Sequence, residues 1–161
     1  MNATNRKAFL DMIAHSEGTS TSRATKNNGY DVIVTGSDGR PEIFTNYREH
    51  PFFTGRPAKV INSRGLRSTA SGRYQFLVQH WNHYRIALAL PDFGPASQDR
   101  WALQLIRERG ALPDIDAGNF AAAVKKVRNL WASLPGAGYG QPEHTLAKLQ
   151  AAYVRAGGVV A

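Results

Sequence analysis

The residue pattern of the chain changes twice, and these changes constrain the fold more than any other feature of the sequence. Up to about residue 17, and again from residue 73, apolar residues recur at the spacing of amphipathic helices. Between these parts, residues 20–66 are rich in Thr, Ser, Asn and Gly, and they hold two short β-prone runs, 30–35 and 42–45, around a turn-forming segment. This order predicts an α+β protein with one helix, a small β-hairpin lobe and then a mostly helical lobe.

Five helices are expected from the apolar spacing and from residues that favour helix ends. The first begins near Thr4 or Asn5 and ends at about Glu17, because a glycine such as Gly18 commonly follows a helix. The other four are expected at 74–90, at 95–109, at 119–134 and from Pro142 to Gly157–Gly158. We see no internal repeat or linker, so residues 1–161 are expected to form one domain whose β lobe covers roughly residues 20–66.

Composition narrows the function classes without selecting one. The chain has 161 residues, 42% of them hydrophobic, which suffices for a buried core. Lys and Arg number 20 against 12 Asp and Glu, and the resulting net charge of +8 suits an anionic partner such as nucleic acid, an acidic cell wall or a membrane face. No cysteine is present, which excludes disulfides, zinc–thiolate sites and cysteine nucleophiles.

The N-terminal residues carry only short apolar patches, interrupted by Asp11 and His15. They lack the apolar core of a signal peptide, and no apolar run of about 20 residues could span a bilayer. We therefore expect no membrane anchor, and the absence of cysteine fits a protein that folds in a reducing cytoplasm.

Glu17 is the first candidate for chemistry. At roughly 100° per residue, it falls within the helical sector that Phe9 and Leu10 occupy. Burial on an apolar face and the negative end of the helix dipole would both raise the pKa of its carboxyl. A carboxyl that is protonated near neutral pH can act as a general acid toward a glycosidic oxygen. The alternative is a helix-end glutamate that bends into solvent or pairs with a basic residue.

Two glycine-containing segments are candidates for sugar binding. Residues 71–76 combine the ring of Tyr74 and the amide of Gln75 with Gly72, although these residues could equally form a turn and a core position. Residues 134–142 place three glycines around Tyr139, which indicates a shaped loop, and an ordinary connection between helices is the alternative.

Other kinds of site find little support. His80 and His83 could meet on one helix face, but the spacing indicates no third ligand, so no metal is expected. No phosphate-binding loop and no GxSxG nucleophile motif occur. A basic stretch, 56–85, has aromatic residues nearby that could stack on bases, but no recognition motif accompanies it, so nucleic acid is not the expected partner.

Six blocks carry a resemblance to a known family. They lie in matching order from residue 6 to residue 141, at 6–12, 16–19, 29–34, 72–75, 108–113 and 131–141. On these blocks the chain strongly resembles the lambda-type phage endolysins, which are lytic transglycosylases with a lysozyme-like fold. Segment 35–42 is longer than the resemblance leads us to expect, and segment 50–64 matches little.

The resemblance implies that Glu17 is the sole catalytic carboxylate and that the active-site cleft lies between the helical lobe and the β lobe. Glu17 would protonate the oxygen between N-acetylmuramic acid and N-acetylglucosamine, and would then act as base while the C6 hydroxyl attacks C1. The product would be a 1,6-anhydromuramic end, and neither water nor a cofactor would be needed. By the same resemblance, the substrate groove would be lined by Tyr30, Gly72, Arg73, Tyr74, Gln75, Tyr139 and Gly140.

The resemblance also implies where the protein acts. Its partner would be the glycan strands of peptidoglycan, whose carboxylates would attract a chain of charge +8. The enzyme would leave the host cytoplasm through a membrane lesion made by a holin and would then reach the periplasm and the wall. We expect a monomer, because no long heptad or exposed apolar stripe is evident.

Two alternatives stay open at this point. A hydrolytic muramidase would pair Glu17 with a second carboxylate, for which Asp31 and Asp38 are candidates, although the pattern of the other common phage type fails at Lys26 and Val32. A module that binds the cell wall or nucleic acid without catalysis is the second alternative.

Overall fold

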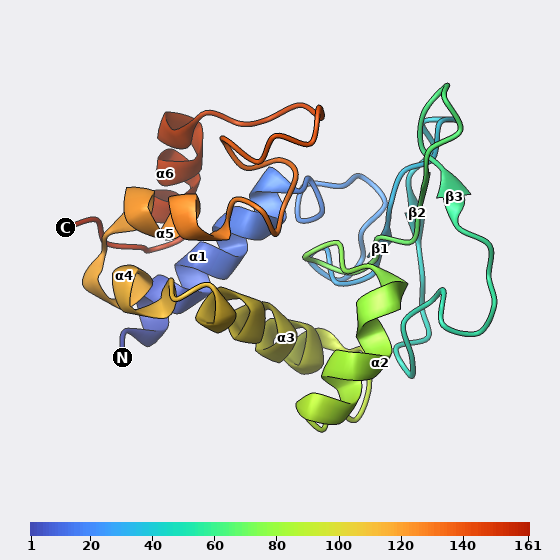
Figure 1. The fold of residues 1–161 in the computed structure, drawn as a ribbon, viewed down its shortest axis with the longest axis horizontal. Coiled ribbons are helices and arrows are strands. Elements are labelled where there is room, and N and C mark those ends of the chain that lie inside the picture. The colour runs from blue at the N-terminus through green and yellow to red at the C-terminus, as the bar shows by residue number, and fades with distance from the viewer. The chain divides into compact units, whose positions relative to one another are not determined.

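A computed structural model describes all residues, 1–161 (Figure 1). The chain forms two compact units, one made of residues 1–17 and 102–161, the other of residues 18–101. We call them unit 1 and unit 2. In chain order the elements are α1 (Ala3–Ser16), β1 (Val32–Ile33), β2 (Glu42–Ile43), β3 (Lys59–Val60), β4 (Arg67–Ser68), α2 (Val78–Ala87), α3 (Pro95–Glu108), α4 (Leu112–Ala117), α5 (Phe120–Val127) and α6 (Leu146–Arg155).

Unit 1 is built around α1, which contacts α4 and α6 (Figure 1). The helix begins one residue earlier than expected because the side chain of Asn2 caps it, accepting a hydrogen bond from the backbone of Asn5. Phe9 packs edge-on against the rings of Phe120 and Tyr153, which come from α5 and α6. The first helix is therefore the centre of a helical cluster formed with the C-terminal part of the chain.

A buried amide joins the two ends of the chain within unit 1. Asn5 is 2% exposed, its Nδ2 donates to the carbonyl of Ile115, and its Oδ1 accepts the backbone N–H of Val159. These partners lie 110 and 154 positions away, and they satisfy a polar group that would otherwise be costly to bury.

The helical boundaries in the second half of the chain differ from those expected, for local reasons. The helix α4 was not anticipated, because its six residues are too few to show a helical period. Helix α5 ends at Val127, although buried Trp131 and Leu134 continue the apolar spacing beyond it in turns. Helix α2 begins only at Val78, since Gln75 adopts a positive φ of 52° and a bridge joins Ser71 to Phe76. None of the helices is long and apolar enough to cross a membrane.

Unit 2 holds the expected hairpin and a second strand pair. Strand β1 pairs antiparallel with β2 through Val32–Ile43 and Ile33–Glu42, which confirms the hairpin predicted from residues 30–45, with strands of two residues each. The pair β3–β4 was missed because Lys59–Val60 and Arg67–Ser68 show no apolar alternation. Unit 2 also extends beyond residue 66, since it includes α2 and the first half of α3.

An aromatic cluster forms the core of unit 2. The ring of Phe76 stacks on Trp101 with centroids 3.9 Å apart, and Phe93 lies edge-on to Trp81 at 5.3 Å. All four side chains are buried. Their large apolar area stabilises a unit whose regular strands are too short to do so.

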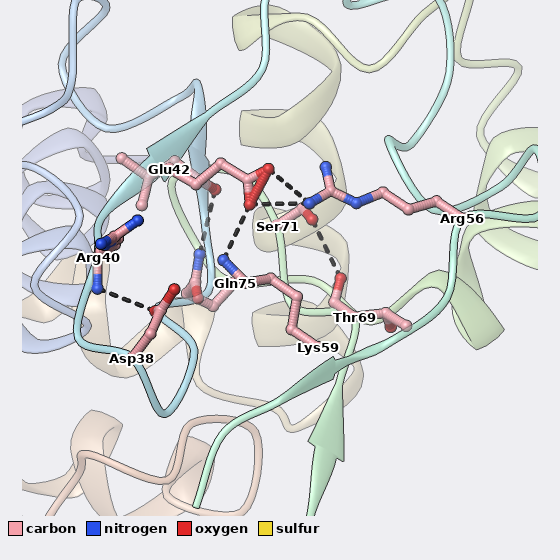
Figure 2. A network of polar contacts seen from close by, with 9 residues as sticks. Asp38, Arg40, Glu42, Arg56, Lys59, Thr69, Ser71 and Gln75 are labelled. Atoms are coloured by element: carbon pink, nitrogen blue, oxygen red, sulfur yellow. Dashed lines mark hydrogen bonds and ion pairs between the residues drawn. The ribbon is translucent and has the colours of Figure 1, made fainter.

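Part of the basic stretch is neutralised within unit 2, as Figure 2 shows. The carboxylate of Glu42 forms ion pairs with Arg56 and with Lys59, the latter at 2.9 Å. Another arginine of the stretch, Arg73, is 4% exposed. Three of the cationic residues of 56–85 are therefore paired or buried within unit 2.

His50 is a buried and neutral histidine within this unit. It is 1% exposed, its Nδ1 accepts the backbone N–H of Phe52, and its Nε2 lies 2.8 Å from the carbonyl of Phe76. A carbonyl can only accept, so Nε2 carries the proton and the ring is neutral. Burial lowers the pKa of His50 to about 4, against a slight rise from its bond to Phe76.

The lowered pKa of His50 predicts that the folded chain loses stability in acid. The unfolded chain takes up the proton near pH 6.5, whereas the folded chain takes it up only near pH 4, so His50 costs roughly 3 kcal/mol of stability as the pH falls through this window. Urea unfolding measures this difference. As the pH falls from neutral to 4, the free energy of unfolding of His50→Gln should rise by about this amount relative to that of the wild type. The matched control is Asn82→Ala at an exposed position of α2, which removes no titratable group, so its difference from the wild type should not vary with pH. A constant difference for His50→Gln would contradict the prediction.

Candidate active site

Glu17 ends the first helix of unit 1. It occupies the C-cap of α1, where its backbone N–H donates to the carbonyl of Ile13 at 2.9 Å. The next residue, Gly18, has a φ of +74°, which lets the chain leave the helix axis at once. The side chain of Glu17 is half-buried, and Ser16 before it is buried.

The carboxyl of Glu17 titrates near neutrality. Burial raises its pKa from 4.5 to about 7, and a hydrogen bond with the side chain of Ser133 opposes part of that rise. The direction agrees with the one expected from its place on the apolar face of the helix. At neutral pH the group is present in both protonation states, so it can give a proton as well as take one.

A pair of hydroxyl groups and a histidine lie at the end of α1. The Oγ of Ser133 lies 2.7 Å from the Oγ of Ser16. The ring of His144 donates through Nε2 to the carbonyl of Ser16 at 3.0 Å, and the backbone N–H of His144 donates to the carbonyl of Ser133 at 2.9 Å. The sequence analysis singled out none of these three residues, because no local pattern joins positions that lie 117 or 128 residues apart.

The loop that follows Ser133 has a fixed shape within unit 1. The carboxylate of Glu143 accepts the backbone N–H groups of Gly136 at 2.9 Å and Gly138 at 3.2 Å. Tyr139 is 57% exposed, and its hydroxyl donates to the carbonyl of Asn129 at 2.7 Å. Gly136, Gly138 and Gly140 all have positive φ. The loop thus presents an aromatic ring to solvent on a backbone that glycines allow.

Three of the other expected site residues lie together in unit 2. The guanidinium of Arg73 lies over the rings of Tyr30 and Tyr74, at 5.1 Å and 5.7 Å. Both tyrosine hydroxyls donate to the same carboxylate oxygen of Asp99. Arg73 and Tyr74 are buried, whereas Tyr30 is half-buried. Burial and the charge of Asp99 raise the pKa of Tyr74 far above its ordinary value.

This arrangement changes what these residues can do. Because the ring of Tyr74 is enclosed, it does not offer a face on which a sugar could stack in this structure. Tyr74 and Arg73 instead hold the half-buried ring of Tyr30 in place. Asp99, which sequence reasoning missed, anchors the cluster, and only its position one turn into a predicted helix could have drawn attention to it.

Gly72 and Gln75 shape the backbone beside this cluster. Gly72 has a φ of +82°, and a Cβ there would lie 2.4 Å from Oε1 of Gln98. That same oxygen accepts the backbone N–H of Arg73 at 2.8 Å, so no larger residue fits at position 72. The half-buried side chain of Gln75 donates to the carbonyl of Gly72 at 3.0 Å.

The two candidate second carboxylates occupy different settings in unit 2. Asp31 is 3% exposed and accepts hydrogen bonds from the hydroxyl of Thr25 and the backbone N–H of Lys26. Asp38 is exposed in a turn, where it accepts the N–H of Arg40 at 3.0 Å (Figure 2). His80 and His83 both lie on α2, and the structure gathers no group of three or more His, Cys, Asp or Glu side chains that could hold a metal ion.

Unit 1 is helical and carries a carboxyl at the end of α1, and unit 2 holds two short antiparallel strand pairs, so the chain is an α+β protein. Solved structures show that the fold is lysozyme-like. A structure of bacteriophage lambda lysozyme complexed with a chitohexasaccharide matches with a TM-score of 0.90 and 51% identity, covering 100% of this chain and 99% of that one. A second structure of lysozyme from bacteriophage lambda matches with a TM-score of 0.85 and 50% identity.

The sequence comparisons identify the family. Residues 7–160 match the family model described as Endolysin, and the chain belongs to the endolysin family. The endolysin of Escherichia phage P2 is 66% identical over 157 residues, which cover 98% of this chain and 95% of the relative. The endolysin of Escherichia phage lambda is 53% identical over 156 residues, covering 96% and 92%. These findings confirm the resemblance drawn from the sequence: the chain is a phage endolysin, an enzyme that acts on peptidoglycan to lyse the host cell wall.

The raised pKa of Glu17 predicts that this residue lowers the stability of the folded chain at neutral pH and above. The folded chain holds the Glu17 proton up to about pH 7, but the unfolded chain loses it near 4.5, so the free energy of unfolding falls as the pH rises through this window. Chemical denaturation should therefore show the free energy of unfolding of Glu17→Gln rising, relative to that of the wild type, by roughly 2–3 kcal/mol from acid to alkaline pH. This value allows for the partial exposure of Glu17.

The matched control is Glu143→Gln in the same unit. Hydrogen bonds from Gly136 and Gly138 lower the pKa of Glu143, so its contribution should not vary above pH 4.5. If the difference in the free energy of unfolding between Glu17→Gln and the wild type is also constant with pH, the carboxyl of Glu17 does not titrate near neutrality.

Proposed function

We propose that the chain is a peptidoglycan lytic transglycosylase and that Glu17 is its one catalytic carboxylate. The observation that carries this proposal is a half-buried carboxyl whose pKa of about 7 is set by burial and by one serine, with no second carboxylate among the causes. A reaction in which a single group is first acid and then base requires a carboxyl of this kind.

In the first step, protonated Glu17 gives its proton to the oxygen that links C1 of N-acetylmuramic acid to C4 of N-acetylglucosamine. The C1–O bond breaks, and the leaving sugar departs with a free 4-hydroxyl. In the second step the C6 hydroxyl of the same muramic acid bonds to C1, and the Glu17 carboxylate takes its proton. The result is a 1,6-anhydro end, the enzyme returns to its starting state, and no water is consumed.

Glycan recognition is the second part of the proposal. A lambda lysozyme of 51% identity has been crystallised with a chitohexasaccharide, and we infer that this chain binds the glycan strand of peptidoglycan. In unit 1 the exposed ring of Tyr139 and the adjacent Gly140 would contact sugar. In unit 2 we assign contact to Tyr30 and Gln75, with Gly72, Arg73 and Tyr74 shaping the surface from beneath.

The wider setting follows from the same reasoning. Residues 1–161 would act as a single catalytic domain and as a monomer, and the charge of +8 would favour the carboxylate-rich wall. The enzyme would pass from the host cytoplasm to the wall through a lesion made by a holin.

The products separate transglycosylation from hydrolysis. Mass spectrometry of soluble fragments from purified Gram-negative sacculi should show muramic ends one water lighter than the reducing form, because the C6 hydroxyl replaces water as nucleophile. Ends that carry the full mass of the reducing sugar would show a hydrolase, and Asp31 and Asp38 would then be tested as the second carboxylate.

Loss of one carboxyl should abolish the activity. We expect Glu17→Gln to reduce lysis of sacculi by at least about a hundredfold, since general acid–base catalysis contributes on this scale, while circular dichroism shows an intact fold. Asp38→Asn is the matched control, because this exposed carboxylate only caps a turn, and it should keep near wild-type activity. Lysis by Glu17→Gln at the wild-type rate would refute the mechanism, and wall binding without lysis by the wild type would identify a binding module.

A further inference from the structure

The carboxyl of Glu17 is connected to two hydroxyl groups in series. Ser133 hydrogen-bonds to Glu17, and its Oγ lies 2.7 Å from the Oγ of Ser16. Ser16 is 5% exposed, so water does not readily replace this contact. All three residues belong to unit 1.

The single proton of each hydroxyl fixes the direction of these bonds. When Glu17 is ionised, its carboxylate can only accept, so Ser133 donates to it and must in turn accept the hydroxyl proton of Ser16. When Glu17 is protonated, its O–H can donate to Ser133, which is then free to donate to Ser16. The same pair of hydroxyls therefore offers Glu17 a partner in both of its protonation states.

We propose that Ser133, supported by Ser16, is a positioning residue that keeps the Glu17 carboxyl in one orientation while it changes from acid to base. This inference rests on the proposed function of Glu17. Without such a partner, a half-buried carboxylate would be free to rotate away from the reacting oxygen or to recruit a stray water molecule after it has lost its proton.

The backbone around the pair is tied in a way that supports this role. His144 bonds to both serines, through its ring to the carbonyl of Ser16 and through its N–H to the carbonyl of Ser133. The last residue of α1 and the segment at residue 133 are thereby fixed to each other by a third residue. These backbone bonds help to hold the two hydroxyl oxygens 2.7 Å apart.

Other ionisable groups near the end of α1 must be considered in any test that uses pH. They are His15 on α1, His144 before α6, Arg155 on α6 and Glu143 in the loop that follows Ser133. His15 has its pKa lowered by burial first, and then by the charges of Arg155 and His144. None of these groups is altered in the variants below, so their effect on the titration of Glu17 stays the same in every comparison.

The direct readout is the titration of Glu17 itself, followed by carbon NMR of its side-chain carboxyl. Ser133→Ala should move the titration midpoint upward by roughly one pH unit, because the ionised form loses a charged hydrogen bond. Ser16→Ala should move it in the same direction by less, and Ser133→Thr, which keeps the hydroxyl, should restore the wild-type midpoint.

The matched control is Thr145→Ala in the same unit. The hydroxyl of Thr145 caps α6 by accepting the N–H of Lys148, so its loss lowers stability without removing a partner of Glu17. The thermal midpoint of this variant should fall while the Glu17 titration stays unchanged. A titration shift in Thr145→Ala as large as that in Ser133→Ala would mean that general loosening, and not the hydroxyl, moves the pKa.

Wall lysis measured against pH completes the test. The decline of the rate at high pH should move upward together with the titration in Ser133→Ala, and the rate at the optimum should fall about tenfold, the effect of one lost positioning hydrogen bond. An unchanged titration in Ser133→Ala and in Ser16→Ala overturns the proposal. A shifted titration with an unshifted rate profile would show that Glu17 is not the catalytic acid, which refutes the proposed function separately from the hydroxyl contact.

Discussion

The burial of α1 among the C-terminal helices is the interaction on which the rest of the structure depends. Packing of Phe9 against Phe120 and Tyr153 encloses the helix, and the amide of Asn5 joins it to the last residues of the chain. Glu17 ends this same helix, and burial there raises the pKa of its carboxyl to about 7. The helix that centres the packing of unit 1 therefore also carries its near-neutral carboxyl.

Glu17 has a different kind of partner from the polar groups buried in unit 2. In unit 2, buried charges are matched: Arg73 lies between two tyrosine rings whose hydroxyls bind Asp99, and Asp31 is saturated by a hydroxyl and a backbone N–H. In unit 1, Glu17 has hydroxyl partners but no cation among the causes of its shift. Burial without a compensating cation raises the pKa of Glu17 and favours its protonated form, which is the form that a proton donor needs.

Sequence patterns predicted those features that depend on neighbours along the chain. The angular position of Glu17 among apolar residues indicated the direction of its pKa shift, and the turn segment between two β-prone runs indicated the β1–β2 hairpin. Short elements such as α4 and β3–β4 were not predicted, because they are too short to show a regular spacing of apolar residues. Ser133, His144 and Asp99 escaped because their partners lie far away in sequence, and the enclosure of Tyr74 depended on packing that no local pattern contains.

Unit 1 is discontinuous along the chain, and this has a consequence for synthesis. Residues 18–101, which form unit 2, emerge from the ribosome as one uninterrupted segment, but α1 must wait for residues 102–161 before it can pack. Until then, the carboxyl of Glu17 stays hydrated and has the acidity of any exposed glutamate. Ser133, which hydrogen-bonds to Glu17, is translated more than a hundred residues after it. A chain that stops before residue 102 therefore carries the glutamate without the groups that shift its pKa, and the proton-transfer group forms only after residues 102–161 have been made.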